Sequence, residues 1–124
     1  MLQNTKTIKH KKASEAESLV AQALANQGWH ILAKNFRIVG AELDIVAQKG
    51  GTVAVVEVKA RVRKPNSMAD LETLLPQRKK NALQRGGVCY LAKLPLNPQC
   101  IRFDLAIVWG KAPPYSIDYF VSVI

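Results

Sequence analysis

Histidine and cysteine are scarce in this chain, which contains two of each among 124 residues. Cys89 and Cys100 form no C-x-x-C pair, and neither His10 nor His30 has a neighbour at metal-ligand spacing. We therefore expect both histidines to be structural or surface residues. Because no apolar signal segment opens the sequence, we expect a cytoplasmic protein with reduced thiols.

Long hydrophobic runs are also missing, since no apolar stretch approaches the roughly 18 residues that a membrane-spanning helix needs. Acidic residues are few: nine Asp and Glu face 18 Lys and Arg, which leaves a formal charge of +9. A field of this sign favours polyanions or anionic membrane surfaces as partners. Charge alone leaves open a basic protein with no role in nucleic-acid binding.

The chain has the length of one domain, because a division would leave two pieces too small for good cores. Residues 1–12 carry four lysines without hydrophobic periodicity and predict a basic flexible tail. This tail serves either solubility or contact with nucleic acid. Residues 13–124 are expected to form a single domain.

Residues 13–28 predict the first helix. Ser14 is the expected N-cap, with Glu17 as its capping-box partner, and Gly28 is the expected stop. The apolar face of this helix comprises Ala16, Val20, Ala23 and Leu24. Glu17 lies close to that face on the helical wheel, whereas Glu15 points away, so Glu17 is either only a cap or a carboxylate directed inward.

Three strands are expected next, at residues 29–36, 37–48 and 52–61, with Gly40 marking a bulge or a close backbone approach. A hairpin turn at 49–51 makes the third strand antiparallel to the second. Valines on both faces of the third strand place it in the middle of a sheet that is covered on both sides.

Residues 61–75 are expected to connect this sheet to a second helix, which begins with Pro76 in its first turn and ends near Lys93. Lys79 lies in line with the packed side of this helix, and Gly86-Gly87 indicates either close packing or a kink. Strands at 100–110 and 115–124 complete an α/β fold, a mixed sheet flanked by helices.

Acidic side chains gather on the second and third strands. Alternation along a strand puts Glu42 and Asp44 on one face, with Leu43 and Ile45 on the other. In the same way, Glu57 and Lys59 share a face of the next strand. Asp44 and Glu57 are equidistant from the turn. We therefore expect them to lie directly opposite each other on the two strands, or to be offset by one register step.

Two such carboxylates about 4 Å apart repel by roughly 4 kcal/mol at an effective dielectric constant of about 20. Lys59 offsets part of this cost, and a divalent cation between the oxygens offsets more. Oxygen ligands without His or Cys favour Mg²⁺ or Mn²⁺. A purely structural ion-pair cluster remains the alternative.

In the metal-site interpretation, Asp44 and Glu57 hold the ion, with the backbone carbonyl of Val58 as a further ligand. Lys59 orients or deprotonates the attacking water, or neutralises charge on a phosphate. Glu17 completes the ligand set, or positions a water or a second ion. Arg61, Arg63 and Lys64 form either a solvated loop or a phosphate clamp beside the site. Asp104 is expected outside the site, paired with Arg102.

Two motifs resemble those of known nucleases. G-x-E-x-D at 40–44 and V-E-V-K-A-R at 56–61 resemble the motif core of the PD-(D/E)XK, or restriction-endonuclease-like, superfamily. Nearly the whole chain resembles the uncharacterised bacterial YraN-like proteins, through AESLVAQAL, KNFRIVGAELDIVA, VVEVKARV, PQRKKNAL and IRFDLAIV. Ala41 departs from the second glycine that this family commonly has, and RKPNSMAD lacks its aromatic-glycine step.

The resemblance implies a restriction-endonuclease-like mixed five-stranded sheet, similar to that of archaeal Holliday-junction resolvases. It implies a metal site at Glu17, Asp44, Glu57 and Lys59, with Glu42 as an uncertain supporting residue. Lys79 is the residue typical of the family on the second helix and is expected to contact nucleic acid, together with Arg61, Arg63 and Lys64.

Three functions follow as hypotheses. The first is a Mg²⁺- or Mn²⁺-dependent endonuclease that acts on structured or branched DNA, a homodimer by analogy with resolvases. The second is a nucleic-acid-binding module that keeps the nuclease fold without turnover. The third is a structural domain whose carboxylate–lysine cluster only stabilises the sheet.

Overall fold

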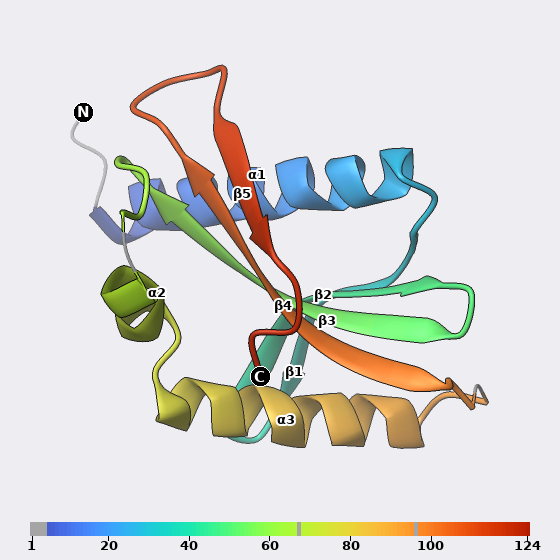
Figure 1. Ribbon diagram of the computed structural model, residues 1–124. Coiled ribbons are helices and arrows are strands. Elements are labelled where there is room, and N and C mark those ends of the chain that lie inside the picture. The colour runs from blue at the N-terminus through green and yellow to red at the C-terminus, as the bar shows by residue number, and fades with distance from the viewer. Residues whose placement is uncertain (1–4, 67, 96) are drawn as a thin grey trace.

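The structure, a computed structural model, describes residues 5–66, 68–95 and 97–124. Its elements follow the chain in this order: α1 (Thr5–Asn26), β1 (His30–Ile38), β2 (Ala41–Lys49), β3 (Thr52–Arg61), α2 (Met68–Leu74), α3 (Gln77–Ala92), β4 (Cys100–Trp109) and β5 (Ser116–Phe120). Figure 1 shows α1 and α3 on opposite sides of the sheet. None of the described helices is long and apolar enough to cross a membrane.

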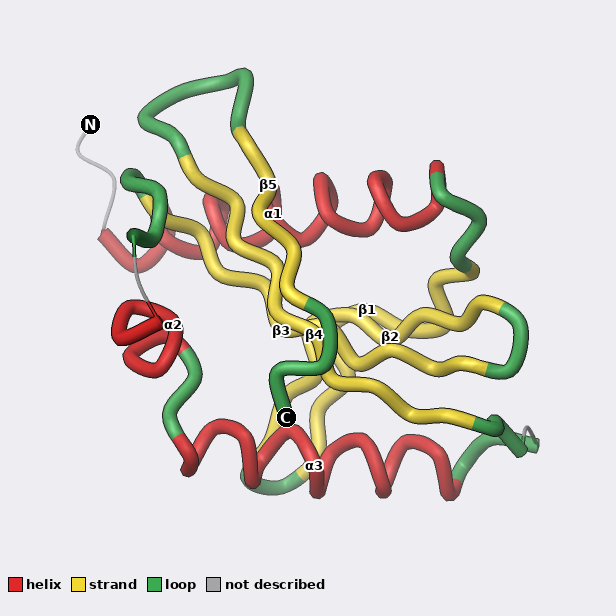
Figure 2. The backbone as a smooth tube through the Cα atoms, in the orientation of Figure 1, coloured by secondary structure: helices red, strands yellow, loops and turns green. Residues whose placement is uncertain are grey.

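The five strands form one sheet in the order β1-β2-β3-β4-β5, so β3 lies in the middle as predicted. Only β3 and β4 run parallel among these neighbours, and the other pairs are antiparallel. A core cluster that includes Val20 and Ile45 packs under α1, and a second cluster that includes Leu43 and Leu83 packs under α3. The predicted fold class, a mixed five-stranded sheet flanked by helices, is confirmed (Figure 2).

The first helix begins earlier than expected. Residues 5–13 contain neither Gly nor Pro, and the helix runs through them from Thr5. Ser14 therefore lies inside the helix, and its prediction as the N-cap is wrong. Residues 5–12 of the predicted basic tail have a helical backbone, and residues 1–4 lie outside the described residues.

The predicted stop at Gly28 is confirmed. Gly28 has a φ of +93°, in the left-handed region that glycine adopts without steric cost. The amide of Trp29 donates to the carbonyl of Leu24, and the amide of Gly28 donates to that of Ala25. These two hydrogen bonds close the last turn of the helix.

The boundary between the first two strands was predicted wrongly. β1 continues to Ile38, which pairs with Ala41, so Val39 and Gly40 form a two-residue turn. Gly40 is therefore a turn residue with a φ of +80° and not a bulge inside a strand. Positive φ at the second central residue of a turn, as in type II turns, favours glycine. Arg85 on α3 donates a hydrogen bond to the Gly40 carbonyl at 3.3 Å, which ties the turn to α3.

The second hairpin turn, at Gly50 and Gly51, lies where it was predicted. From there, β2 and β3 pair in regular register as far as Ile45 opposite Val56. β2 then leaves β3 but stays paired with β1, while β3 stays paired with β4 as far as Arg61 opposite Trp109. The sheet therefore forks, and the β1–β2 hairpin turns toward α3 (Figure 1).

The fork breaks the alternation of side chains along β2. Ile45 packs in the cluster under α1, whereas Leu43 packs in the cluster under α3. The prediction that these two residues share a face is therefore wrong. Strict alternation holds for a strand of constant orientation, and β2 changes its orientation where it separates from β3.

Two helices connect the halves of the sheet. α2 lies in a segment predicted to be only a connection, and Pro76 is the N-cap of α3 and not a residue of its first turn. Gly86 and Gly87 lie in an uninterrupted helix and allow close packing. A Cβ atom at Gly86 would lie 2.8 Å from Leu43 Cδ2, and one at Gly87 would lie 3.1 Å from Phe103 Cε1.

Asp104 on β4 forms the ion pair that was predicted. Its buried carboxylate accepts hydrogen bonds from Arg102, from the Tyr119 hydroxyl at 2.6 Å and from the Ser122 amide at 3.0 Å. It thereby anchors the last residues of the chain to β4. β5 ends at Phe120, so residues 121–124 do not extend the strand as expected.

We predict that Gly86→Ala lowers the free energy of unfolding by about 1–2 kcal/mol. Overpacking against the fully buried Leu43 costs about 1–3 kcal/mol and outweighs the gain of up to about 1 kcal/mol in helix propensity. Urea denaturation followed by circular dichroism measures the change. Gln84→Ala on the exposed side of α3 is the control and should change stability little; equal stabilisation of both variants would contradict close packing at Gly86.

Candidate metal and nucleic-acid site

The fork in the sheet holds the two carboxylates that the sequence placed together. Asp44 is the first residue of β2 beyond the ladder with β3, and its Oδ2 accepts a hydrogen bond of 2.9 Å from the Val58 amide. The Asp44 side chain thus accepts the hydrogen bond that a backbone carbonyl would accept in a continuous β-ladder. Asp44 and Glu57 are adjacent across the fork, as their equal distance from the turn predicted.

Glu57 is the more buried of the two acids, with 3% of its side chain exposed. Its Oε1 lies 3.4 Å from Lys59 Nζ and 3.5 Å from Lys79 Nζ. Its Oε2 is buried and has no hydrogen-bond partner among the residues that the structure describes. A buried carboxylate oxygen without a partner is costly in a folded protein, so this atom is suited to bind a ligand.

Burial raises the pKa of Glu57 to about 7, and the neighbouring Asp44 adds to the effect against the two lysines. Burial also raises the pKa of Asp44, whereas the hydrogen bond from the Val58 amide acts in the opposite direction. The nearby lysines therefore do not offset the cost of burying the two carboxylates. A divalent cation would do so, and the oxygen-only donor set fits Mg²⁺ or Mn²⁺.

Glu17 approaches the site from α1. It lines a cleft of about 730 Å³ together with Asp44, Glu57, Val58 and Lys59. Burial, followed by the charge of Asp44, raises the pKa of Glu17. The expectation that Glu17 points inward is confirmed.

Whether Glu17 binds a metal stays a prediction. Within residues 5–66, 68–95 and 97–124, no three His, Cys, Asp or Glu side chains lie close enough together to hold an ion. The pair formed by Asp44 and Glu57 is thus the centre of the candidate site, and Glu17 faces it across the cleft.

Asn35 is a residue of the cleft that sequence reasoning missed. Its side chain hydrogen-bonds Glu17, which works against the rise in the pKa of that carboxyl. It has a φ of +53° within β1, a conformation that asparagine tolerates better than most residues. A single asparagine in an otherwise strand-like segment was the sequence signal that could have identified this residue.

Glu42 lies at the rim of the cleft and is paired with Arg37 at 3.6 Å. Both side chains are substantially exposed, so this ion pair contributes little to stability. Both residues also line a second, larger cleft on the α3 side of the fork.

The second cleft has a volume of about 930 Å³ and is strongly basic. Among the described residues that line it, Glu42 is the only acid, and the cationic residues are Arg37, Lys59, Arg61, Arg78, Lys79 and Arg85. Arg37, Glu42, Lys59 and Arg61 line both clefts. We call the pair of clefts, with the fork between them, the forked groove.

Three cationic residues of the groove were not predicted, because they come from β1 and α3 and not from the motif strand. Arg78 and Arg85 are seven residues apart and so share a face of α3, which was the available signal. Lys79 was predicted as a nucleic-acid contact. The structure places it both in the groove and within ion-pair distance of Glu57.

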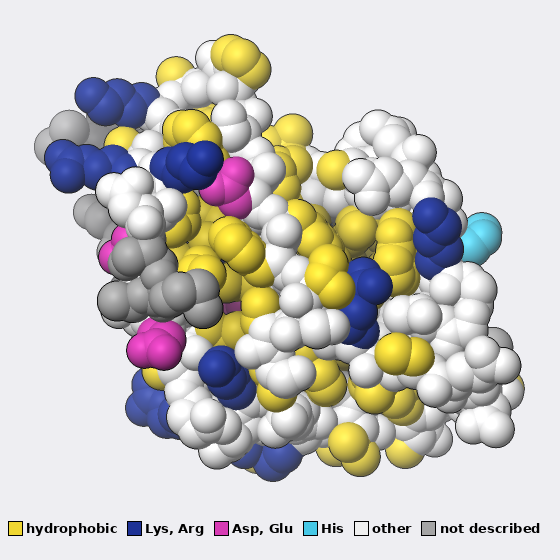
Figure 3. All heavy atoms as spheres, viewed as in Figure 1, with side chains coloured by type: hydrophobic (Ala, Val, Ile, Leu, Met, Phe, Trp, Pro, Cys, Tyr) yellow, Lys and Arg dark blue, Asp and Glu magenta, His cyan; other side chains and the backbone are white. Residues whose placement is uncertain are grey.

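The side chains of Arg61, Arg63 and Lys64, which were predicted to act together, lie in three different surroundings. Arg61 lines both clefts, whereas Lys64 lies over the ring of Trp109 at 5.9 Å and Arg63 is exposed outside the groove. On the face in Figure 3, hydrophobic side chains gather over the middle, and Lys and Arg lie mainly toward the left and lower margins.

Comparison with known proteins gives a family but no activity. A family model described as "Uncharacterised protein family UPF0102" matches residues 16–108. A UPF0102 protein of Gloeobacter violaceus is 35% identical over 85% of this chain and 82% of its own length. UPF0102 proteins of Pelobacter propionicus and a Synechococcus species are 30% and 34% identical over 88% and 95% of this chain, and over 79% and 84% of their own lengths.

We predict that Glu57→Gln removes part of the pH dependence of stability in EDTA. The folded-state pKa of Glu57 is raised from 4.5 to about 7, so the wild-type chain gains stability from this group below pH 4.5 and loses it as the pH rises through 7. The loss is on the order of 3 kcal/mol. Glu57→Gln should be at least as stable as wild type at pH 8.

Urea denaturation between pH 4.5 and 8 measures this difference. Glu15→Gln, at an exposed acid of α1, is the matched control and should follow the wild-type curve. If Glu57→Gln were clearly less stable than wild type at pH 8, the stabilisation by the ion pairs with the two lysines would exceed the cost of burying the Glu57 charge. The carboxylate–lysine cluster would then serve to stabilise the sheet.

Proposed function

This chain belongs to uncharacterised protein family UPF0102, and we propose that it is a Mg²⁺- or Mn²⁺-dependent endonuclease of structured or branched DNA. One observation carries the proposal. The buried Glu57 has one oxygen without a hydrogen-bond partner among the described residues, beside Asp44 in a fork that opens on a basic groove.

The metal would be held by Asp44 and Glu57. The Val58 amide faces the fork, and the N–H and C=O groups of one strand residue point to the same side, so its carbonyl is available as a further ligand. When bound, the ion would supply Lewis-acid activation of a phosphodiester and a coordinated water of lowered pKa. Its charge would also offset the cost of burying the two carboxylates, which is the main cause of their raised pKa values.

Lys59 is the catalytic lysine in this proposal. Its ammonium group lies 3.4 Å from Glu57, and its side chain is 24% exposed at the junction of the two clefts. From there it can donate a hydrogen bond to the attacking water or to a non-bridging phosphate oxygen. Hydrogen bonds directed at developing charge are among the largest contributions to catalysis.

Lys79 holds Glu57 from the α3 side and thereby orients the carboxylate. Glu17 faces the site from α1, and its raised pKa suits a group that accepts and returns a proton. Hydrolysis adds the water oxygen to phosphorus and breaks one P–O ester bond. The water gives up a proton and the leaving oxygen takes one up, so the products are a phosphate monoester and a hydroxyl group.

The basic cleft supplies the affinity for a nucleic-acid backbone. Six cationic side chains face it from β1, β3 and α3, against one carboxylate. Phosphate contacts of this kind bind without sequence preference and weaken with salt. A cut in both strands of a junction needs two such sites, so a homodimer forms part of the proposal for that substrate.

The alternative is a nucleic-acid-binding module without turnover. The same basic cleft favours it, because phosphate binding does not require the metal. The two functions differ in what Asp44 and Glu57 do, since only the endonuclease needs them to be ionised and bound to an ion.

Cleavage of labelled four-way junctions, flaps, single strands and duplexes in Mg²⁺ or Mn²⁺ tests the proposal. We predict metal-dependent cleavage that falls by at least about 100-fold in Asp44→Asn and in Glu57→Gln, because each removes a metal ligand. Glu72→Gln, at an exposed acid of α2 that lines neither the groove nor its neighbouring pocket, should cleave as wild type does.

Cleavage that persists in both substituted chains would identify a contaminant and contradict the proposal. Salt-dependent binding of the same DNA with no cleavage in either metal would establish the binding module instead.

A further inference from the structure

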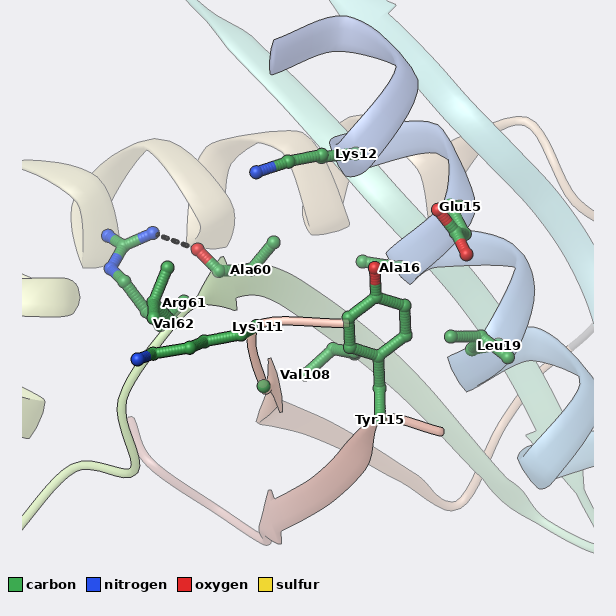
Figure 4. A pocket seen from close by; sticks show the side chains of 11 residues that line it. Lys12, Glu15, Ala16, Leu19, Ala60, Arg61, Val62, Val108, Lys111 and Tyr115 are labelled. Carbon is green, nitrogen blue, oxygen red and sulfur yellow. Dashed lines mark hydrogen bonds between the residues drawn. The ribbon is translucent and has the colours of Figure 1, made fainter. Parts of the chain in front are cut away.

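A small pocket adjoins the forked groove and has no part in the metal site. It has a volume of about 140 Å³ and lies between α1, the end of β3 and the connection from β4 to β5 (Figure 4). Apolar side chains form its walls, among them Leu19, Val62, Val108 and Tyr115. Of the lining residues that the structure describes, Tyr115 is the only aromatic one.

The rim of the pocket is charged. Lys12 approaches from α1, Arg61 from the end of β3 and Lys111 from the connection after β4. Glu15 contributes the only carboxylate among the described lining residues. Figure 4 shows Leu19 on one side of Tyr115, and Lys111 and Arg61 on the other. An apolar cavity with a cationic rim is complementary to an uncharged ring attached to an anionic backbone.

The pocket is continuous with the groove. Lys12, Ala60 and Arg61 line both this pocket and the cleft that contains Asp44 and Glu57. Arg61 Nη1 donates to the Ala60 carbonyl at 2.7 Å, which holds the guanidinium group at the boundary between the two. A nucleic acid whose phosphate lies at the fork can therefore reach the pocket with an adjacent nucleotide.

We propose that this pocket receives one unpaired nucleobase, which stacks on Tyr115 while the neighbouring phosphates contact the cationic rim. This inference rests on the proposed function and narrows its substrate class to DNA with an extruded or single-stranded nucleotide beside the bound phosphate. The pocket suits a single planar ring and is far too small for a base pair in a duplex.

The chemistry of the pocket supports this occupant. Bases stack on aromatic side chains with little sequence preference, because each base has a π face. Gly110 brings its backbone close to the tyrosine, since a Cβ atom there would lie 3.2 Å from Tyr115 Cδ1. The ring is thus held against the chain, which lowers the entropy cost of stacking on it.

Binding in EDTA tests the inference without cleavage. The probe is a duplex with one unpaired 2-aminopurine, compared with the same duplex carrying an abasic residue at that position and with a fully paired duplex. We expect the full chain to quench the unpaired fluorophore and to bind the first duplex about tenfold more tightly than the other two.

Substitution of Tyr115 distinguishes base stacking on an aromatic ring from simple contact with an apolar side chain. Tyr115→Phe should keep both the quenching and the tenfold preference, whereas Tyr115→Leu should lose both and bind the fully paired duplex as wild type does. Thermal denaturation confirms that each variant is folded. Equal affinity of the wild-type chain for the three duplexes, or a preference that survives Tyr115→Leu, would overturn the inference.

The outcome does not depend on catalysis. A tenfold preference that requires an aromatic residue at 115, in a chain that never cleaves DNA, would support the pocket and refute the endonuclease. Metal-dependent cleavage by a chain without this preference would refute the pocket alone.

Discussion

The hydrogen bond from the Val58 amide to Asp44 marks the point on which the arrangement of the site depends. β2 must separate from β3 for the β1–β2 hairpin to reach α3. That separation would leave the half-buried amide of Val58 without a hydrogen-bond acceptor. The Asp44 carboxylate satisfies the donor and is itself placed beside Glu57. The same fork that shapes the fold thus brings two acids together.

Electrostatics then give the fork its chemical character. Glu57 is buried between Asp44 and the ammonium groups of Lys59 and Lys79, and its pKa is still raised to about 7. The two lysines therefore do not offset the cost of burying this carboxylate. Around it, cationic side chains from three elements line the larger cleft. A divalent cation and a phosphate backbone are complementary to these two features.

Sequence reasoning located the acidic pair because the hairpin at Gly50 and Gly51 fixes the register, and a register relates distant residues by simple counting. It also directed Glu17 inward, since a helix has a regular period. It failed at Leu43, where the fork interrupts alternation, and at Arg37 and Arg78, which join the groove only through tertiary packing. The early start of α1 was missed because Ser14 resembles a cap even inside a helix.

The central claim is that the fork binds a divalent cation through Asp44 and Glu57. Anomalous diffraction from crystals of the full chain soaked in Mn²⁺ tests it most directly. We expect an anomalous peak between these two carboxylates, at oxygen-ligand distances of about 2.0–2.6 Å, that disappears in Asp44→Asn. Well-ordered crystals in which Glu57 remains paired with Lys59 and Lys79, with no peak in the fork, would contradict it.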